Sequence, residues 1–196
     1  MVAPSTTSST RPRLAELYNE TVAPKTAEHF GLRNMHQWPR PAKVVVNCGI
    51  GRFLENQKLK PEVRDTVIAT LTTITGQRPV LVMAKKSVSN FKVREGAPSA
   101  YMVTLRRDRM WHFLDRLINL AIPRIRDFRG LKDTSFDRQG NYSMGLVEQA
   151  VWAEINMSTV TFTHGMNINV VFENSNREMS KFVLSELGMP FVRKEQ

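Results

Sequence analysis

Cysteine and histidine are the residues from which a nucleophilic or metal-dependent site would be built in this sequence. Cys48 is the only cysteine, and the histidines are His29, His36, His112 and His164. No two of these residues have the spacing of a zinc-binding pair, and the sequence identifies no carboxylate as the group that would orient the ring of His112 or His164. Cys48 falls in a predicted strand, where a small core residue is the commoner role. We therefore expect no catalytic residue and no metal site.

Two short motifs contain the residue types that bind phosphate groups, and both are incomplete. Gly49-x-Gly51 lacks the third glycine of a dinucleotide-binding turn. Lys85-Lys86-Ser87 is similar to the end of a phosphate-binding loop, but no glycines precede it. Neither motif supports a nucleotide-dependent enzyme, and we expect no cofactor.

The charge of the chain points to a different chemistry. Lys and Arg number 28 against 18 Asp and Glu, which gives a formal net charge of +10. Residues 85–130 hold eleven of the basic residues and four of the acidic ones, so this segment carries +7 of the total. A basic excess of this kind suits a polyanion, because each Lys or Arg that meets a phosphate releases a counterion. A soluble basic protein with no such partner is the alternative.

Periodicity and punctuation predict a mixture of helices and strands. Helices are expected over 14–30 with a kink at Pro24, from Pro61 to Gly76, from an N-cap at Asp108 to Pro123, and after an N-cap within 174–176. Strands are expected over 42–48, 79–84, 101–106 and 166–172, with loop-like chain at 85–100 and irregular structure at 124–145.

This order of elements predicts a two-layer α+β fold, with a mostly antiparallel sheet and helices packed on one face. The other face would be open, as in many RNA-binding sheets. Residues 1–13 are expected to form a flexible tail, and residues 14–196 a single domain. No apolar run approaches the roughly 20 residues of a membrane span, and no secretory signal is expected, so a membrane partner is not predicted.

A series of ordered motifs makes the sequence more specific. They are Asn47-Cys-Gly-Ile-Gly51, Gly76-Gln-Arg-Pro79, Ala84-Lys-Lys-Ser-Val88, Phe91-Lys-Val-Arg-Glu-Gly96, Val103-Thr-Leu-Arg106, Ile122-Pro-Arg-Ile-Arg-Asp-Phe-Arg-Gly130 and Gly140-Asn-Tyr-Ser-Met-Gly145. This series resembles the bacterial-type large-subunit ribosomal protein five family, which binds 5S rRNA, over about residues 14–193. The resemblance implies a structural, non-enzymatic role in translation, in the large subunit of the cytoplasmic ribosome.

The resemblance also implies partners and contact residues. The protein would lie in the central protuberance of the large subunit, and its partners would be 5S rRNA, 23S rRNA, other 5S rRNA-binding ribosomal proteins, a small-subunit head protein and the tRNA in the peptidyl site. For 5S rRNA, the matching residues are Asn47, Gln77 and Thr104, joined by Lys85, Lys86, Ser87 and Arg106. For tRNA, they lie in the loop 89–100 and are Phe91, Lys92, Val93, Arg94, Glu95, Gly96 and Pro98. For further rRNA or bridge contacts, they are Arg124, Arg126, Arg129, Asn141 and Tyr142.

Two features leave alternatives open. Gln77 beside Gly76 suits a turn as well as an RNA contact, and Arg126 or Arg129 could pair with Asp127 or Asp133. The sequence also departs from the family pattern at Ser99-Ala100, at Arg107, where a glycine is common, and in the longer segment 52–60. An enzyme acting on RNA and a regulatory module working off the ribosome remain as competing functions.

Overall fold

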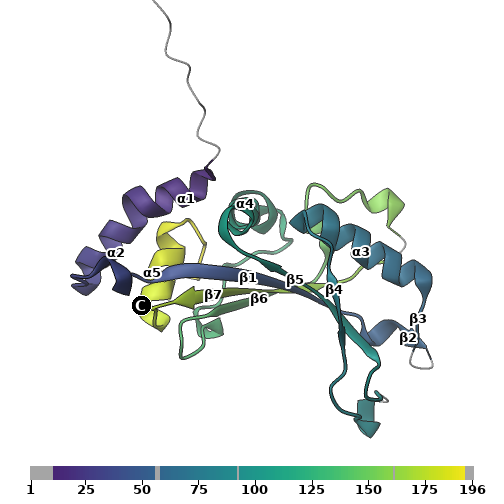
Figure 1. Cartoon of the computed structure of the whole chain (residues 1–196). Helices are drawn as coiled ribbons and strands as arrows, with labels where there is room; N and C mark the ends of the chain where they lie inside the picture. The colour runs from purple at the N-terminus through teal and green to yellow at the C-terminus, as the bar shows by residue number, and fades with distance from the viewer. Residues whose placement is uncertain (1–10, 56–57, 92, 161, 193–196) are drawn as a thin grey trace, which may run out of the picture.

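A five-stranded antiparallel sheet forms the centre of the computed structural model, which describes residues 11–55, 58–91, 93–160 and 162–192 (Figure 1). Its order is β4-β5-β1-β7-β6. The bounds are β1 Arg40–Gly49, β4 Val80–Met83, β5 Pro98–Leu105, β6 Tyr142–Leu146 and β7 Met166–Glu173. A second, two-stranded sheet pairs β2 (Leu54–Glu55) with β3 (Lys58–Leu59). The predicted antiparallel α+β fold is confirmed.

The helices are α1 (Arg13–Leu17), α2 (Ala23–Phe30), α3 (Pro61–Thr75), α4 (Arg107–Arg116) and α5 (Arg177–Glu186). Figure 1 shows α1, α3 and α4 over one face of the large sheet, and the β4–β5 arm extending away from them. None of the helices in the described ranges is long and apolar enough to cross a membrane.

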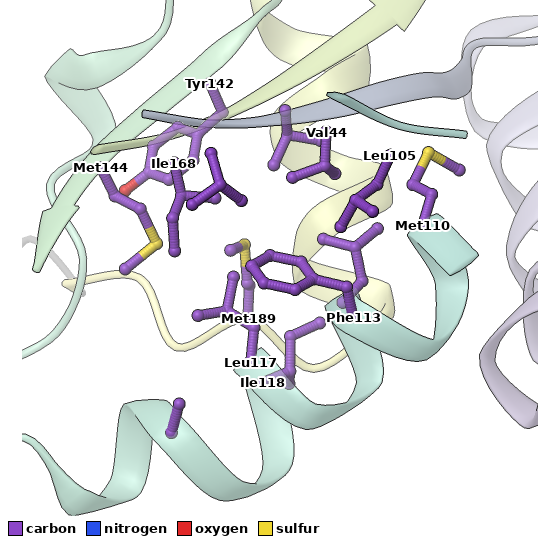
Figure 2. Close-up of a cluster of buried hydrophobic side chains, with 14 of the residues drawn as sticks. Val44, Leu105, Met110, Phe113, Leu117, Ile118, Tyr142, Met144, Ile168 and Met189 are labelled. Atoms are coloured by element: carbon purple, nitrogen blue, oxygen red, sulfur yellow. The ribbon is translucent and has the colours of Figure 1, made fainter. Parts of the chain in front are cut away.

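The core lies between α4 and the sheet, because alternate strand residues point toward the helices. In β1, Val44, Val46 and Cys48 are fully buried, whereas Val45 and Asn47 are only half-buried on the other face. Figure 2 shows side chains of the sheet, among them Val44, Leu105 and Ile168, lying against the ring of Phe113. The predicted apolar face is buried in full. It begins on α4 and continues into the π-helical turn Leu117–Ala121 that follows, and it consists of Met110, Phe113, Leu114, Leu117, Ile118 and Ala121.

The first helical region contains the break predicted at Pro24. A π-helical turn, Tyr18–Val22, separates α1 from α2 immediately before the proline. Pro24 has no N–H to donate to the preceding turn, and its ring crowds the carbonyl one turn back, which explains the wider turn there. Gly31 then ends α2 in the left-handed region, with φ +65°.

The start of α4 differs from the prediction. Arg106, not Asp108, is the N-cap residue, and it caps no backbone N–H with its side chain. Asp108 lies in the first turn, where a negative charge is favourable to the helix dipole. Arg107 has φ +51°, so the turn keeps a left-handed conformation although the residue is not glycine.

The sequence-based prediction was wrong about one strand boundary and missed one strand. β5 begins at Pro98 rather than Tyr101, so part of the expected loop is strand. Residues 142–146 were expected to be irregular but form the edge strand β6, paired with β7. Its alternation is real, since Tyr142, Met144 and Leu146 are buried, but Ser143 and Gly145 between them are poor strand formers.

Candidate RNA-binding surface

The sheet face opposite the helices carries two rows of side chains that follow from the strand register. One row runs across all five strands through Val80, Met102, Asn47, Asn167 and Gly145. The second row runs through Thr104, Val45, Asn169 and Ser143. Directly opposed residues in antiparallel strands share a face, so these nine residues form one surface, here called the open face. These nine residues include amides and hydroxyls but no charged side chain, and Lys43, two residues before Val45 on β1, continues the same side of the sheet.

Asn47 and Thr104, two of the predicted 5S rRNA contacts, lie on this open face as diagonal neighbours. Both residues are half-buried. The Oδ1 atom of Asn47 is buried and accepts no hydrogen bond in the part of the chain that the structure describes. A buried acceptor left without a partner lowers the free energy of unfolding by about 1–3 kcal/mol. The unpaired Oδ1 of Asn47 therefore does not stabilise the fold.

Gln77 lies next to the open face, between the end of α3 and β4. Its backbone forms a tight turn with Thr75, whose Oγ1 donates to the Gln77 carbonyl at 3.1 Å and accepts from the Gln77 N–H at 3.3 Å. Within the described ranges, the side-chain amide makes no hydrogen bond. The backbone of Gln77 therefore serves the turn, while its side chain is free for another partner.

The segment between β4 and β5 is a folded arm rather than an irregular loop. Val88 and Val93 form an isolated antiparallel bridge, and the N–H of Gly96 donates to the Ala84 carbonyl at 3.0 Å. Ser87 Oγ accepts from the Glu95 N–H at 2.9 Å, so this hydroxyl is used inside the arm.

Most of the predicted contact residues in the arm face solvent. Lys85, Lys86, Arg94 and Glu95 are exposed, and Phe91 is 78% exposed. Val93 and Pro98 are half-buried. Lys92, predicted to contact tRNA, lies outside the described residues.

The arginines after α4 are exposed, as phosphate-binding side chains would be. Arg124, Arg126 and Arg129 form no ion pair in the described part of the chain. Asp133, the carboxylate considered as a partner for them, faces Lys181 at 3.5 Å instead. Arg106, at the end of β5, is also exposed.

Asn141 and Tyr142 have internal roles that the sequence did not reveal. Asn141 Nδ2 donates to Asp137 at 2.7 Å, and its Oδ1 accepts from the Phe172 N–H at 3.0 Å. Tyr142 is 1% exposed, and burial raises its pKa to about 12. Because both side chains hold the loop before β6 in place, an external contact through Tyr142 is not supported.

A buried pair that the sequence did not predict links β1 to the chain before β7. Cys48 Sγ lies 3.2 Å from Nδ1 of His164, which precedes β7. Burial raises the pKa of the Cys48 thiol to about 11. Burial also lowers the pKa of His164, and this effect outweighs a hydrogen bond to the Gly165 carbonyl, which raises that pKa. A neutral, enclosed thiol is a poor nucleophile, so the expected core role of Cys48 is supported. The described residues contain no group of three or more side chains suited to a metal ion.

Three polar residues of the open face were not among the predicted contacts. They are Asn167 and Asn169 on β7 and Ser143 on β6. The alternation of β7 was readable in the sequence and placed both asparagines on its polar side. Only the register shows that Asn167 lies directly opposite Asn47, because the two strands are far apart in the sequence.

Comparison with known proteins identifies the family. Residues 34–94 match the model of Ribosomal protein L5, and residues 98–191 match the model of the C-terminus of the same ribosomal protein family. The large ribosomal subunit protein uL5 of Synechocystis sp. is 48% identical over 179 residues, covering 91% of this chain and 97% of the relative. The uL5 protein of Kocuria rhizophila is 49% identical over 180 residues, covering 92% of this chain and 93% of the relative.

These matches cover nearly the whole chain and agree with the motifs that suggested the family. They confirm a structural, non-enzymatic role in translation, with ribosomal RNA as the partner. The chain belongs to the uL5 family of large ribosomal subunit proteins.

Proposed function

We propose that the open face binds 5S rRNA and so helps to attach that RNA to the large subunit in the central protuberance. The observation that carries this proposal is the combination of Asn47 and Thr104 on an uncharged polar surface. Amide and hydroxyl groups can donate to or accept from the 2′-hydroxyls and base edges of RNA, while carboxylates would repel its phosphates. The Oδ1 of Asn47 is buried without a partner in the described part of the chain, so the side-chain amide would have to turn outward to accept from an RNA donor.

Basic residues at the border of this surface would supply the phosphate contacts. Lys85 and Lys86 follow β4, and Arg106 follows β5, so all three are anchored to strands of the same sheet. Each is exposed and forms no ion pair with the residues that the structure describes, so each can neutralise a phosphate without first losing such a partner.

Two other regions would meet the remaining partners. The β4–β5 arm projects away from the body of the protein and carries Phe91 and Arg94, which suits contact with the peptidyl-site tRNA (Figure 1). Exposed Arg124, Arg126 and Arg129 would contact 23S rRNA or the small-subunit head protein. Residues 14–196 would act as a single domain, since strands from both halves of the chain share one sheet.

The test is binding of the purified protein to 5S rRNA and to a control RNA of the same length, across a series of salt concentrations. We expect selective binding to 5S rRNA with a negative salt slope. Lys85→Ala and Lys86→Ala should each flatten that slope by less than about one unit. Thr104→Val should weaken binding and leave the slope unchanged, because it removes a hydroxyl and no charge. Equal, weak binding to both RNAs would refute the proposal.

A further inference from the structure

A cavity of about 690 Å³ lies at the end of the sheet where the chain leaves β1. Its wall combines Gly49 and Gly51 with Arg52 and Phe53, the inner side of the β4–β5 arm at Phe91 and Val93, and residues 163–167 before and within β7. The volume falls in the range of about 300–1,000 Å³ that is usual for small-molecule sites. Phe91 and Val93 are among the expected tRNA contacts, and Gly49 and Gly51 belong to a motif behind the family resemblance, but neither expectation explains why these residues line one cavity.

Gly49 and Gly51, two of the three glycines in its wall, are not explained by packing within the described part of the protein. Neither Gly49 nor Gly51 has a positive φ, and a Cβ atom added at either would meet no atom within 4 Å. By contrast, a Cβ at Gly165 would lie 2.6 Å from the Leu146 carbonyl oxygen, so that glycine is needed for packing. Gly49 ends β1 and Gly51 begins a short 3-10 turn, Gly51–Phe53, and both leave backbone bare where a Cβ atom would fit, which suits a partner whose surface comes close to the backbone.

Much of the remaining wall is apolar and aromatic, and several of these side chains are open to solvent. Phe91 and Val147 are 78% and 84% exposed, and both line the cavity. Phe53 is half-buried and held by Phe162, with ring centroids 4.8 Å apart. Exposed apolar side chains gathered around one hollow are typical of a binding site rather than of bare surface.

We propose that this cavity receives one unpaired nucleotide of the RNA bound on the open face, with the base stacked on Phe91 and the backbone against Gly49 and Gly51. This inference rests on the proposed function, since it takes that RNA to be 5S rRNA. Aromatic rings and arginine are the side chains on which extruded bases stack. Phe91 provides the ring, and Arg52 provides a cation at the rim.

Charge and continuity favour RNA over a protein segment as the occupant. Within the described ranges, the cavity wall contains Arg52 but no carboxylate. The cavity also shares Asn167 with the open face, and Gly49 is on the same strand as Asn47. A nucleotide strand crossing the open face can therefore reach the cavity without leaving the protein surface.

The experiment uses the full-length chain and 5S rRNA, without tRNA. Gly51→Val should fill the space beside the backbone without an internal clash, and thermal unfolding should show that the variant folds. Its affinity for 5S rRNA should fall by about tenfold or more at an unchanged salt slope, since no phosphate contact is removed. Phe91→Leu should weaken binding to a similar degree, whereas Phe91→Tyr should retain it, because tyrosine stacks and leucine does not.

The matched control is Leu120→Ala, which truncates a half-exposed apolar residue outside the cavity and should leave RNA affinity unchanged. Chemical probing of base edges should show one unpaired nucleotide protected by the unaltered protein and not by Gly51→Val. If Gly51→Val binds and protects 5S rRNA like the unaltered protein, the cavity proposal is wrong while the proposed function stands.

Two other outcomes have equally definite meanings. If Gly51→Val keeps full RNA affinity but loses a ribosomal protein from assembled subunits, the cavity holds a protein segment and the nucleotide proposal is overturned. If the unaltered protein shows no preference for 5S rRNA, the proposed function fails, and this inference fails with it.

Discussion

Replacement of Asn47 by leucine should separate the stability of the protein from its function. The buried Oδ1 of Asn47 has no partner in the described part of the chain, so the free protein carries the cost of a desolvated acceptor. Leucine has a similar volume and lies opposite Met102 in the register, where it gains an apolar neighbour. Removing an unpaired acceptor recovers about 1–3 kcal/mol, and we take the lower end because Asn47 is only half-buried. The free energy of unfolding should therefore rise by about 1 kcal/mol.

The same substitution should weaken binding to 5S rRNA. One lost hydrogen bond is worth about 0.5–1.5 kcal/mol, and the RNA group that it served would be left unpaired. A total near 1.4 kcal/mol corresponds to about a tenfold rise in Kd.

Urea unfolding and filter binding on the same preparations measure both effects. Asn119→Leu is the matched control, because Asn119 is an exposed asparagine on the helical side that bonds to Asp115. It should lower stability slightly and leave RNA binding unchanged. If Asn47→Leu destabilises the protein, or stabilises it with no loss of RNA affinity, the role assigned to this amide is refuted.

Three further predictions concern the fold. The Cys48 thiol has an ordinary pKa of 9.0 that burial raises to about 11, so the stability it contributes is present below pH 9 and is lost as the pH rises from 9 to 11. Between pH 8 and pH 10 the free energy of unfolding should fall by about 1.3 kcal/mol more in the unaltered protein than in Cys48→Ala. If urea unfolding shows the same change with pH in both proteins, this prediction is wrong. Arg107→Gly should raise the free energy of unfolding by up to about 1 kcal/mol, because φ +51° is strained for arginine and not for glycine. The greater flexibility of glycine in the unfolded chain offsets part of this gain. A clear loss of stability would show that the Arg107 side chain stabilises the fold. Phe113→Ala should cost about 3–5 kcal/mol in chemical unfolding, against less than about 0.5 kcal/mol for exposed Leu120→Ala, and similar losses would mean that Phe113 is not central to the core.

The sequence was most informative where a signal is local. The stripe of α4 and the alternation of β7 both follow from residue spacing, and the structure buries those faces as expected. The amide of Asn176 accepts from the Met179 N–H at 2.9 Å, which is the N-cap geometry predicted from the Asn174–Asn176 cluster. Such features depend on a few consecutive residues and need no knowledge of the rest of the fold.

What could not be predicted depends on contacts between distant segments. The Cys48–His164 pair joins residues on either side of most of the chain, so spacing gives no hint of it. Edge strand β6 was missed because Gly145 weakens its local pattern, while its pairing with β7 stabilises it. From the sequence, the side chain of Asn141 could bind RNA or another part of the protein. Only the structure shows that its Oδ1 accepts a hydrogen bond from the Phe172 N–H. The open face was predicted as a type of surface, but its polar rows required the register.

The order of the strands has a consequence for how this protein is made. Strand β1 is synthesised early and lies in the middle of the sheet, yet both of its neighbours, β5 and β7, come later in the chain. Val46 pairs with Val103 on one side and with Ile168 on the other. Contacts of such long range slow folding, because the chain between the partners must first be closed into a loop. During its own translation, β1 can pair with β5 once residues 98–105 have left the ribosome, but its other edge stays unpaired until β7, residues 166–173, follows near the end of the chain.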